Sequence, residues 1–157
     1  IDLAIEAFNM LGRPLRIVGD GRDYKALKAL AKANIEFVGY LSDDEVRAQM
    51  ARCRGFIFPG EEDFGIAPLE AMAEGRAVIA YAGGGALDTN EDGRTGLFFH
   101  EPTPEALADA VRRFEQSAFD SAYVRRHARR FDVSVFREQL AVFLERAALI
   151  AREGSCR

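Results

Sequence analysis

"GFIFPGEEDFGIAPLEAMAEGRAVIAY", residues 55–81, combines two apolar segments with a helix-like segment between them. The apolar segments at 55–59 and 77–81 are rich in Ile, Val and Phe, as buried strands are. Residues 65–75 have helical character, with Pro68 suited to a first helical turn. A strand, a helix and a second strand in this order are typical of a parallel sheet with a right-handed crossover.

The same alternation extends in both directions along the chain. Apolar runs recur at 15–19, 35–39 and 96–99 at similar intervals. Helix-like stretches separate them, one of them over 23–34, and Ser42 followed by Glu45 predicts a capping box at the start of another. From Thr103, a predicted cap followed by Pro104 at the first helical position, the pattern is helical throughout. We therefore expect an α/β fold: a Rossmann-like parallel sheet with helices on both faces and a helical C-terminal segment.

Composition excludes several functional classes. The 157 residues include 21 Lys and Arg against 25 Asp and Glu, a formal net charge of −4, so a general nucleic-acid binder with a basic face is not expected. No apolar run has the length that a membrane span needs. The two cysteines, Cys53 and Cys156, lack metal-ligand spacing and fit a reducing compartment. We expect a cytoplasmic protein.

Ligands of open parallel sheets bind beyond the carboxyl ends of the strands. The loops there are 19–21, 39–41, 60–66 and 82–85, and most of them contain glycine. Glycine either lets the backbone approach a ligand closely or simply satisfies the turn. None of these loops has the G-x-G-x-x-G or P-loop pattern, so a standard dinucleotide or nucleoside-triphosphate site is weakly supported.

The loop 60–66 carries more specific chemistry. Backbone N–H groups between Phe64 and Ala67 lie at a helix start, where the helix dipole favours a phosphate or a hydroxyl-rich ligand. Glu62 and Glu70 lie about one helical turn apart in depth, and carboxylates accept hydrogen bonds from vicinal hydroxyls. The alternative is that these acids are only solvated, because acidic residues near a helix N-terminus are electrostatically favoured.

The stretch 62–75 resembles the signature of the group 1 (family 4) glycosyltransferases, which have the GT-B fold of two Rossmann-like domains. Their second domain carries E-x-F-G-[IL]-x-x-x-E-A-M-A-x-G. The matching residues here are Glu62, Phe64, Gly65, Ile66, Glu70, Ala71, Met72, Ala73 and Gly75. The segments LRIVGDG (15–21), IEFVGYL (35–41) and AVIAYAGGG (77–85) look like the family's flanking strands and loops.

The resemblance implies a domain that binds a nucleotide-sugar donor, in a parent enzyme that transfers a hexose with retention and needs no metal or other cofactor. It implies that Glu70 takes the ribose hydroxyls and that Glu62, the residue assigned to the catalytic position, holds the donor sugar. Glu62 is not expected to act as a base or nucleophile, because a retaining glycosidase places two carboxylates across one glycosidic bond. The other implied substrate-binding residues are Gly19, Gly39, Tyr40, Phe64, Gly65, Ile66, Ala67 and Leu69.

Likeness to bacterial mannosyltransferases of polysaccharide assembly makes GDP-mannose the expected donor, with UDP- and ADP-sugars as alternatives. The family's Arg and Lys that neutralise the diphosphate normally lie upstream of the helix that opens this chain at Ile1. We therefore expect residues 1–157 to be one domain excised from a longer chain, inactive alone, with the missing N-terminal acceptor domain as its partner. The alternatives are a non-catalytic nucleotide-sugar-binding module and a GT-B nucleotide-sugar epimerase.

Three further features allow two interpretations each. The segment RRHARR (125–130) either contacts anionic lipid, at the inner membrane face, or forms a solvated helix face. His100 and His127 have no partner at metal-ligand spacing, so we expect ordinary surface histidines and no metal site. Phe136, Phe143 and Leu144 are expected in the core, or in the seam toward the missing domain.

Overall fold

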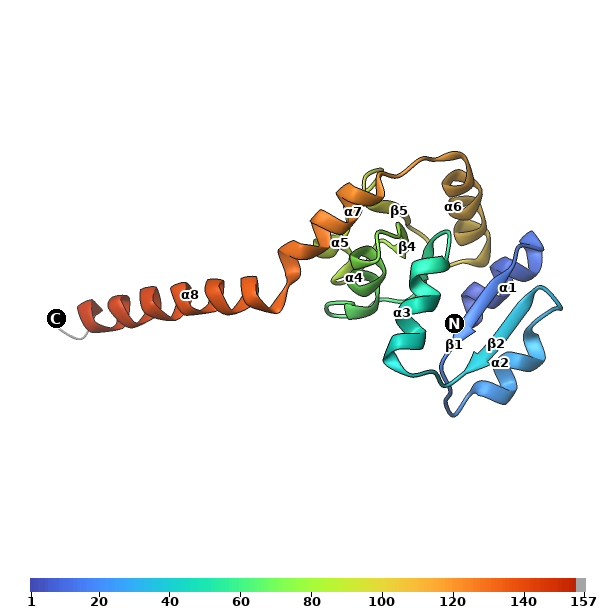
Figure 1. Ribbon diagram of the computed structural model, residues 1–157, viewed down its shortest axis with the longest axis horizontal. Helices are drawn as coiled ribbons and strands as arrows, with labels where there is room; N and C mark the ends of the chain where they lie inside the picture. The colour runs from blue at the N-terminus through green and yellow to red at the C-terminus, as the bar shows by residue number, and fades with distance from the viewer. Residues whose placement is uncertain (155–157) are drawn as a thin grey trace.

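Parallel strands alternate with helices in the computed structural model, which describes residues 1–154 (Figure 1). The strands are β1 (Leu15–Val18), β2 (Ile35–Gly39), β3 (Phe56–Phe58), β4 (Val78–Tyr81) and β5 (Gly96–Phe99). The helices are α1 (Asp2–Leu11), α2 (Tyr24–Leu30), α3 (Asp43–Arg52), α4 (Ile66–Ala73), α5 (Ala86–Thr89), α6 (Pro104–Gln116), α7 (Ser121–Ala128), the 3-10 turn η1 (Arg129–Phe131) and α8 (Val133–Gly154). Every strand predicted from the sequence is present. The short helix α5 was not predicted.

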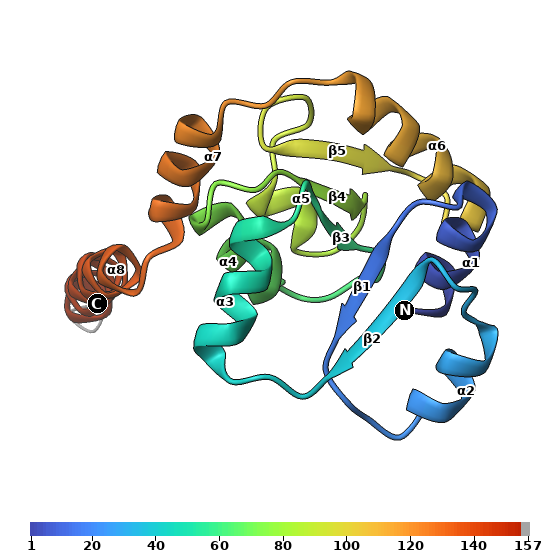
Figure 2. The same cartoon turned by 45° about the vertical axis from the view of Figure 1, so that its right-hand side comes forward.

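The strands form two parallel sheets rather than the single sheet expected. β1 pairs with β2, and β3, β4 and β5 pair in that order, while β1 and β3 form no ladder with each other (Figure 2). Side-chain packing joins the two sheets instead. Helices α1 and α6 share one hydrophobic cluster with Ile35 of β2, Ile79 of β4 and Phe99 of β5. A shared hydrophobic core, and not backbone pairing, therefore holds the two sheets together.

Helices cover both faces of the larger sheet, which confirms the predicted fold class. Successive side chains of a strand point to opposite faces. On β4, Ile79 packs into the cluster made with α1 and α6, whereas Val78 and Ala80 pack into a second cluster with residues of α4 and α7. Both clusters are closely buried, as a core covered on two sides requires.

Helix ends agree with the sequence signals in two cases and differ in one. The Ser42–Glu45 capping box is present, and the Thr103 side chain accepts from the N–H of Ala106. Helix α2 was expected over 23–34 but ends at Leu30. Asn9 of α1 causes this early end, because its side-chain amide donates to the Leu30 carbonyl at 2.7 Å and accepts from the Lys32 N–H at 2.9 Å.

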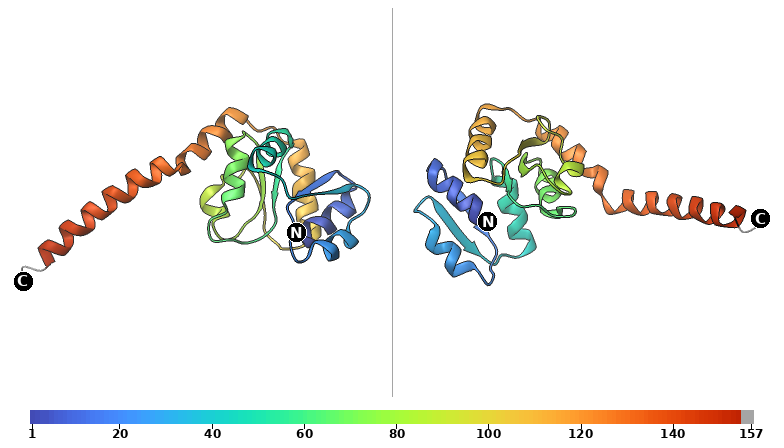
Figure 3. Two further views of the ribbon diagram at one scale, coloured as in Figure 1. Left: turned by 60° about the horizontal axis from the view of Figure 1, so that its bottom comes forward. Right: turned by 180° about the vertical axis from the view of Figure 1, so that it is seen from behind.

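Helix α8 extends away from the rest of the molecule (Figures 1 and 3). Phe136, Phe143 and Leu144 on it are 59%, 65% and 56% exposed. The expectation that these residues lie in the core is therefore wrong for this chain. No helix among the described residues is both long and apolar enough to cross a membrane. Cys156 lies outside the described residues.

Candidate functional site

The start of α4 is built around a glycine. Gly65 has φ of 79° and forms the N-cap, and a Cβ on it would lie 3.2 Å from the ring of Phe58. No side chain caps this helix and no acidic residue lies in its first turn. Pro68 is buried in that turn and carries no N–H. The helix therefore presents first-turn N–H groups that no side chain occupies, together with the positive end of its dipole.

Two carboxylates, one before and one after this helix start in the sequence, are both exposed. Glu62 lies in the loop before it, and Glu70 lies in its second turn. Phe64 and Ile66 between them are 48% and 66% exposed, although both are large and apolar. Of the other predicted contact residues here, Gly65 is buried, and Ala67 and Leu69 are half-buried. The side chain of Leu69 packs against the core, which leaves only its backbone for a ligand.

A turn of three glycines holds the loop 61–64 from the other side. The N–H of Gly85 donates to the Glu62 carbonyl at 2.8 Å. A Cβ on Gly84 would lie 2.3 Å from the Glu62 carbonyl oxygen, and one on Gly85 would lie 2.4 Å from Cα of Phe64. The sequence identified this glycine turn (Gly83, Gly84, Gly85) as a ligand-edge loop. In the structure its glycines make room for a second backbone segment.

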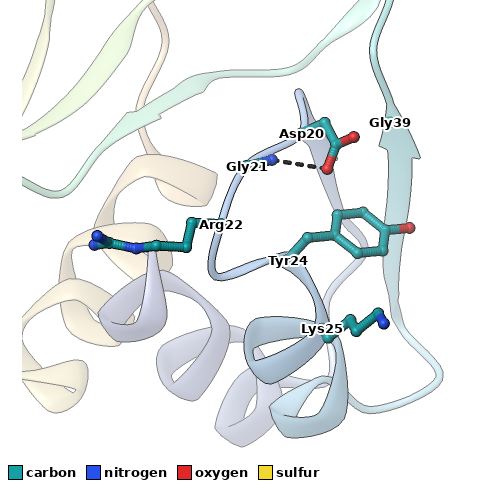
Figure 4. A pocket seen from close by; sticks show the side chains of 6 residues that line it. All are labelled: Asp20, Gly21, Arg22, Tyr24, Lys25 and Gly39. Atoms are coloured by element: carbon teal, nitrogen blue, oxygen red, sulfur yellow. Dashed lines mark hydrogen bonds between the residues drawn. The ribbon is translucent and has the colours of Figure 1, made fainter.

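A second feature lies at the carboxyl ends of β1 and β2. The N–H of Gly19 donates to the Gly39 carbonyl at 2.8 Å, and both glycines have positive φ. Tyr40 beyond them is 84% exposed. A cavity of about 540 Å³ opens here (Figure 4). Its lining residues are Asp20, Gly21, Arg22, Tyr24, Lys25 and Gly39.

Sequence reasoning identified only part of this cavity. Gly39 lines it, and the N–H of Gly19 donates to the Gly39 carbonyl beside it. Tyr24 and Lys25 extend toward the Gly39 side, and Arg22 points the other way (Figure 4). Their signal in the sequence was their position directly after a strand and a glycine turn. Glu62 and Glu70 line neither this cavity nor a second one of about 240 Å³ beside Arg76.

A polar network lies behind the glycine turn. His127 is buried, at 4% exposure, so the expectation of a surface histidine is wrong for this residue. Its Nε2 faces the Thr89 carbonyl at 2.9 Å, and since a carbonyl only accepts, Nε2 carries the proton. Tyr123 donates to Glu91 and lowers the pKa of that carboxyl, and His127, Arg94 and Arg130 add to the effect against the opposing influence of burial.

The basic segment 125–130 is partly occupied within the molecule. Arg125 of α7 donates to the carbonyls of Ala73 and Glu74, at 3.1 and 3.0 Å, where α4 ends. A guanidinium at a helix C-terminus is electrostatically favourable. Arg130 pairs with Glu91 at 3.3 Å. No group of three or more potential metal-ligating side chains occurs in the part of the chain that the structure describes.

Comparison with known proteins identifies the family of this chain and supports its fold. Residues 1–131 match the sequence model of the family described as "Glycosyl transferases group 1". An uncharacterised glycosyltransferase of Methanocaldococcus jannaschii is 31% identical over 116 residues, covering 71% of this chain and 33% of that protein. A GDP-mannose-dependent phosphatidylinositol monomannoside mannosyltransferase of Mycobacterium tuberculosis is 34% identical over 113 residues, covering 64% of this chain and 29% of that protein.

Among solved structures, HepE of Anabaena in complex with UDP and glucose superposes with a TM-score of 0.76 at 24% identity. The match covers 91% of this chain and 44% of HepE, and it supports the fold alone. The chain thus spans less than half the length of the relatives and the structure compared here. The family match extends over most of the sequence and includes the strands, the loop 61–64 and α4. The chain belongs to the group 1 glycosyltransferase family.

Proposed function

We propose that this chain is the donor-binding domain of a two-domain, retaining glycosyltransferase, and that it holds a nucleotide sugar at the start of α4. The observation that carries the proposal is the uncapped N-terminus of α4 between two exposed carboxylates, Glu62 and Glu70. Family membership supplies the reaction class. The greater length of the relatives supports a second, acceptor-binding domain in the whole protein.

Each part of the site has a chemical role in this proposal. The N–H groups from Phe64 to Ala67, with the helix dipole, face the diphosphate and sugar and stabilise the charge that builds up on the leaving group. Glu70 accepts hydrogen bonds from the ribose hydroxyls, and Glu62 accepts them from the donor sugar. The nucleotide base of the donor then lies on the Gly39 side of the molecule, beside Tyr40. No metal ion is required in this arrangement.

The proposed donor is GDP-mannose. The mycobacterial relative is named as a GDP-mannose-dependent enzyme, and a human relative is named as an alpha-1,3/1,6-mannosyltransferase. UDP-sugars are the main rival, because HepE was crystallised with UDP-glucose. Base choice depends on the backbone around Gly39, where the positive φ of 79° sets the direction of the chain toward Tyr40. Binding therefore has to be measured with more than one nucleotide.

The test is a calorimetric and thermal-shift titration with GDP, UDP and ADP, on this chain and on the longer protein proposed to contain it. One nucleotide at a hundredfold excess over its dissociation constant should stabilise the fold by about 2.7 kcal/mol. Glu70→Ala should weaken binding by about tenfold or more, because a charge-assisted hydrogen bond to ribose is lost. Glu61→Gln, an exposed acid in the same loop, is the matched control.

A chelating agent should leave the titration unchanged. Absence of binding by both forms of the protein would exclude the donor site, and unchanged binding by Glu70→Ala would exclude the assigned role of Glu70. Equal binding of all three nucleotides would exclude base selection at Gly39.

A further inference from the structure

The contact between the glycine turn and the loop 61–64 is made by backbone on both sides. The Gly85 N–H binds the Glu62 carbonyl at 2.8 Å, and the space beside Gly84 is filled by that same carbonyl. Backbone atoms at 2.3 to 2.5 Å from a hypothetical Cβ cannot move aside as a flexible side chain can. Any side chain at Gly84 or Gly85 would therefore displace the loop.

The two glycines act on different residues of the loop. At Gly84 the nearest atom is the carbonyl oxygen of Glu62, at 2.3 Å, followed by Cγ of Glu61 at 3.1 Å and the carbonyl carbon of Glu62 at 3.2 Å. At Gly85 they are Cα of Phe64 and the carbonyl oxygen of Asp63, at 2.4 and 2.5 Å. The first contact fixes the backbone position of Glu62, and with it the point from which the Glu62 side chain extends. The second fixes the position of Phe64 directly before the helix start.

The glycine turn is itself anchored in the core. The Thr89 hydroxyl, fully buried, donates to the Gly85 carbonyl at 2.9 Å. The Thr89 carbonyl in turn faces Nε2 of His127 at 2.9 Å. The Phe64 ring of the loop also lies edge-on to Phe131, with centroids 6.3 Å apart. The loop therefore contacts both a turn that is anchored in the core and an aromatic ring that follows α7.

We infer that Gly84 and Gly85 are positioning residues for the donor sugar, acting through Glu62 and Phe64. This inference rests on the function proposed above and adds a pair of residues that never touch the nucleotide in that arrangement. The pair acts on the sugar through Glu62 and on the N–H groups near Phe64, whereas the ribose contact of Glu70 lies on α4 and does not depend on the turn. A side chain at Gly84 should therefore reduce the gain in affinity that the sugar adds to the nucleoside diphosphate.

The experiment compares the affinity for a nucleoside diphosphate with the affinity for its sugar conjugate, GDP against GDP-mannose and UDP against UDP-glucose. It uses this chain and the longer protein, as wild type and as Gly84→Ala, Gly85→Ala and Gly83→Ala. Gly83→Ala is the control. The φ of Gly83 is not positive, and a Cβ there would meet only side-chain atoms, of Tyr81 and Glu61. Gly84→Ala and Gly85→Ala should lower the sugar's contribution by about tenfold, the effect of misplacing one charge-assisted hydrogen bond.

A double substitution separates positioning from general damage. If Gly84 acts through Glu62, then Gly84→Ala should have little further effect on the sugar's contribution once Glu62→Ala has removed the carboxylate. The inference would be overturned if the two substitutions caused independent, additive losses of the sugar's contribution. It would also be overturned if the ratio of the affinities for the sugar conjugate and the nucleoside diphosphate stayed unchanged in both Gly84→Ala and Gly85→Ala. A wild-type protein that binds neither conjugate would overturn the proposed function and this inference together.

Discussion

Individual carboxylates in this chain have sharply different surroundings. Glu62 and Glu70 are exposed at the proposed donor site, whereas Glu91 is surrounded by partners from α7 and from its own turn. Its side chain lies 3.4 Å from Nδ1 of His127 and 3.3 Å from Nη1 of Arg130. This arrangement keeps Glu91 ionised and fixes the turn between β4 and β5 against α7.

Stability should therefore fall in acid partly through Glu91. The pKa of Glu91 is lowered in the folded protein, chiefly by the Tyr123 hydroxyl. A lowered folded pKa contributes stability that is present above the unfolded value, about 4.3, and is lost as the pH falls through the folded value. In thermal melts from pH 7 to pH 3, the melting temperature of Glu91→Gln should fall less with acidification than that of wild type. An equal fall of the melting temperature in both proteins would contradict this role. Glu105→Gln, which changes an exposed acid on α6, is the control.

At the scale of elements, local signals predicted most of the fold. The strands follow from short apolar runs, and the capping box at Ser42 and the Thr103–Pro104 start are read from neighbouring residues alone. The misses depend on distant partners. Helix α5 has four residues and no apolar period to reveal it, and the burial of His127 among arginines requires α7 to lie against Thr89.

The end of α2 is a second case of a distant partner, and it can be tested. Asn9→Ala removes both hydrogen bonds that end this helix and leaves the Leu30 carbonyl and the Lys32 N–H to water. The loss should be about 1–2 kcal/mol in the free energy of unfolding, with faster amide exchange at residues 30–32. Met10→Ala, a neighbour that is 54% exposed, should cost less. Chemical denaturation of the two variants is the measurement, and a larger loss for Met10→Ala would contradict the role of Asn9.

The candidate site shows the same limit between local and distant information. Glu62, Glu70 and the glycine at the start of α4 follow from one continuous stretch, so the sequence predicts them together. The dependence of Glu62 on Gly84 and Gly85 could not be predicted, because it arises where two loops separated by a whole helix and strand approach with backbone against backbone. The spacing of residues along the chain does not predict that approach.

For the whole molecule, the division into two sheets raises the question of whether the chain unfolds as one unit. No backbone ladder joins β1 to β3, so cooperativity must come from the core that α1 and α6 share with both sheets. Ile5 of α1 is fully buried in this core together with Ile35 of one sheet and Ile79 of the other. Loss of its side chain should therefore weaken both sheets together.

Ile5→Ala should lower the free energy of unfolding by about 2–5 kcal/mol, the usual cost of removing a large aliphatic side chain from a core. Amide exchange of the variant should accelerate to a similar degree in β2 and in β4, because a common opening exposes both. Leu30→Ala, at 50% exposure on α2, serves as control and should leave β4 unaffected. If Ile5→Ala accelerates exchange in β1 and β2 while β4 stays protected, the two sheets unfold separately and residues 1–131 are not one cooperative domain.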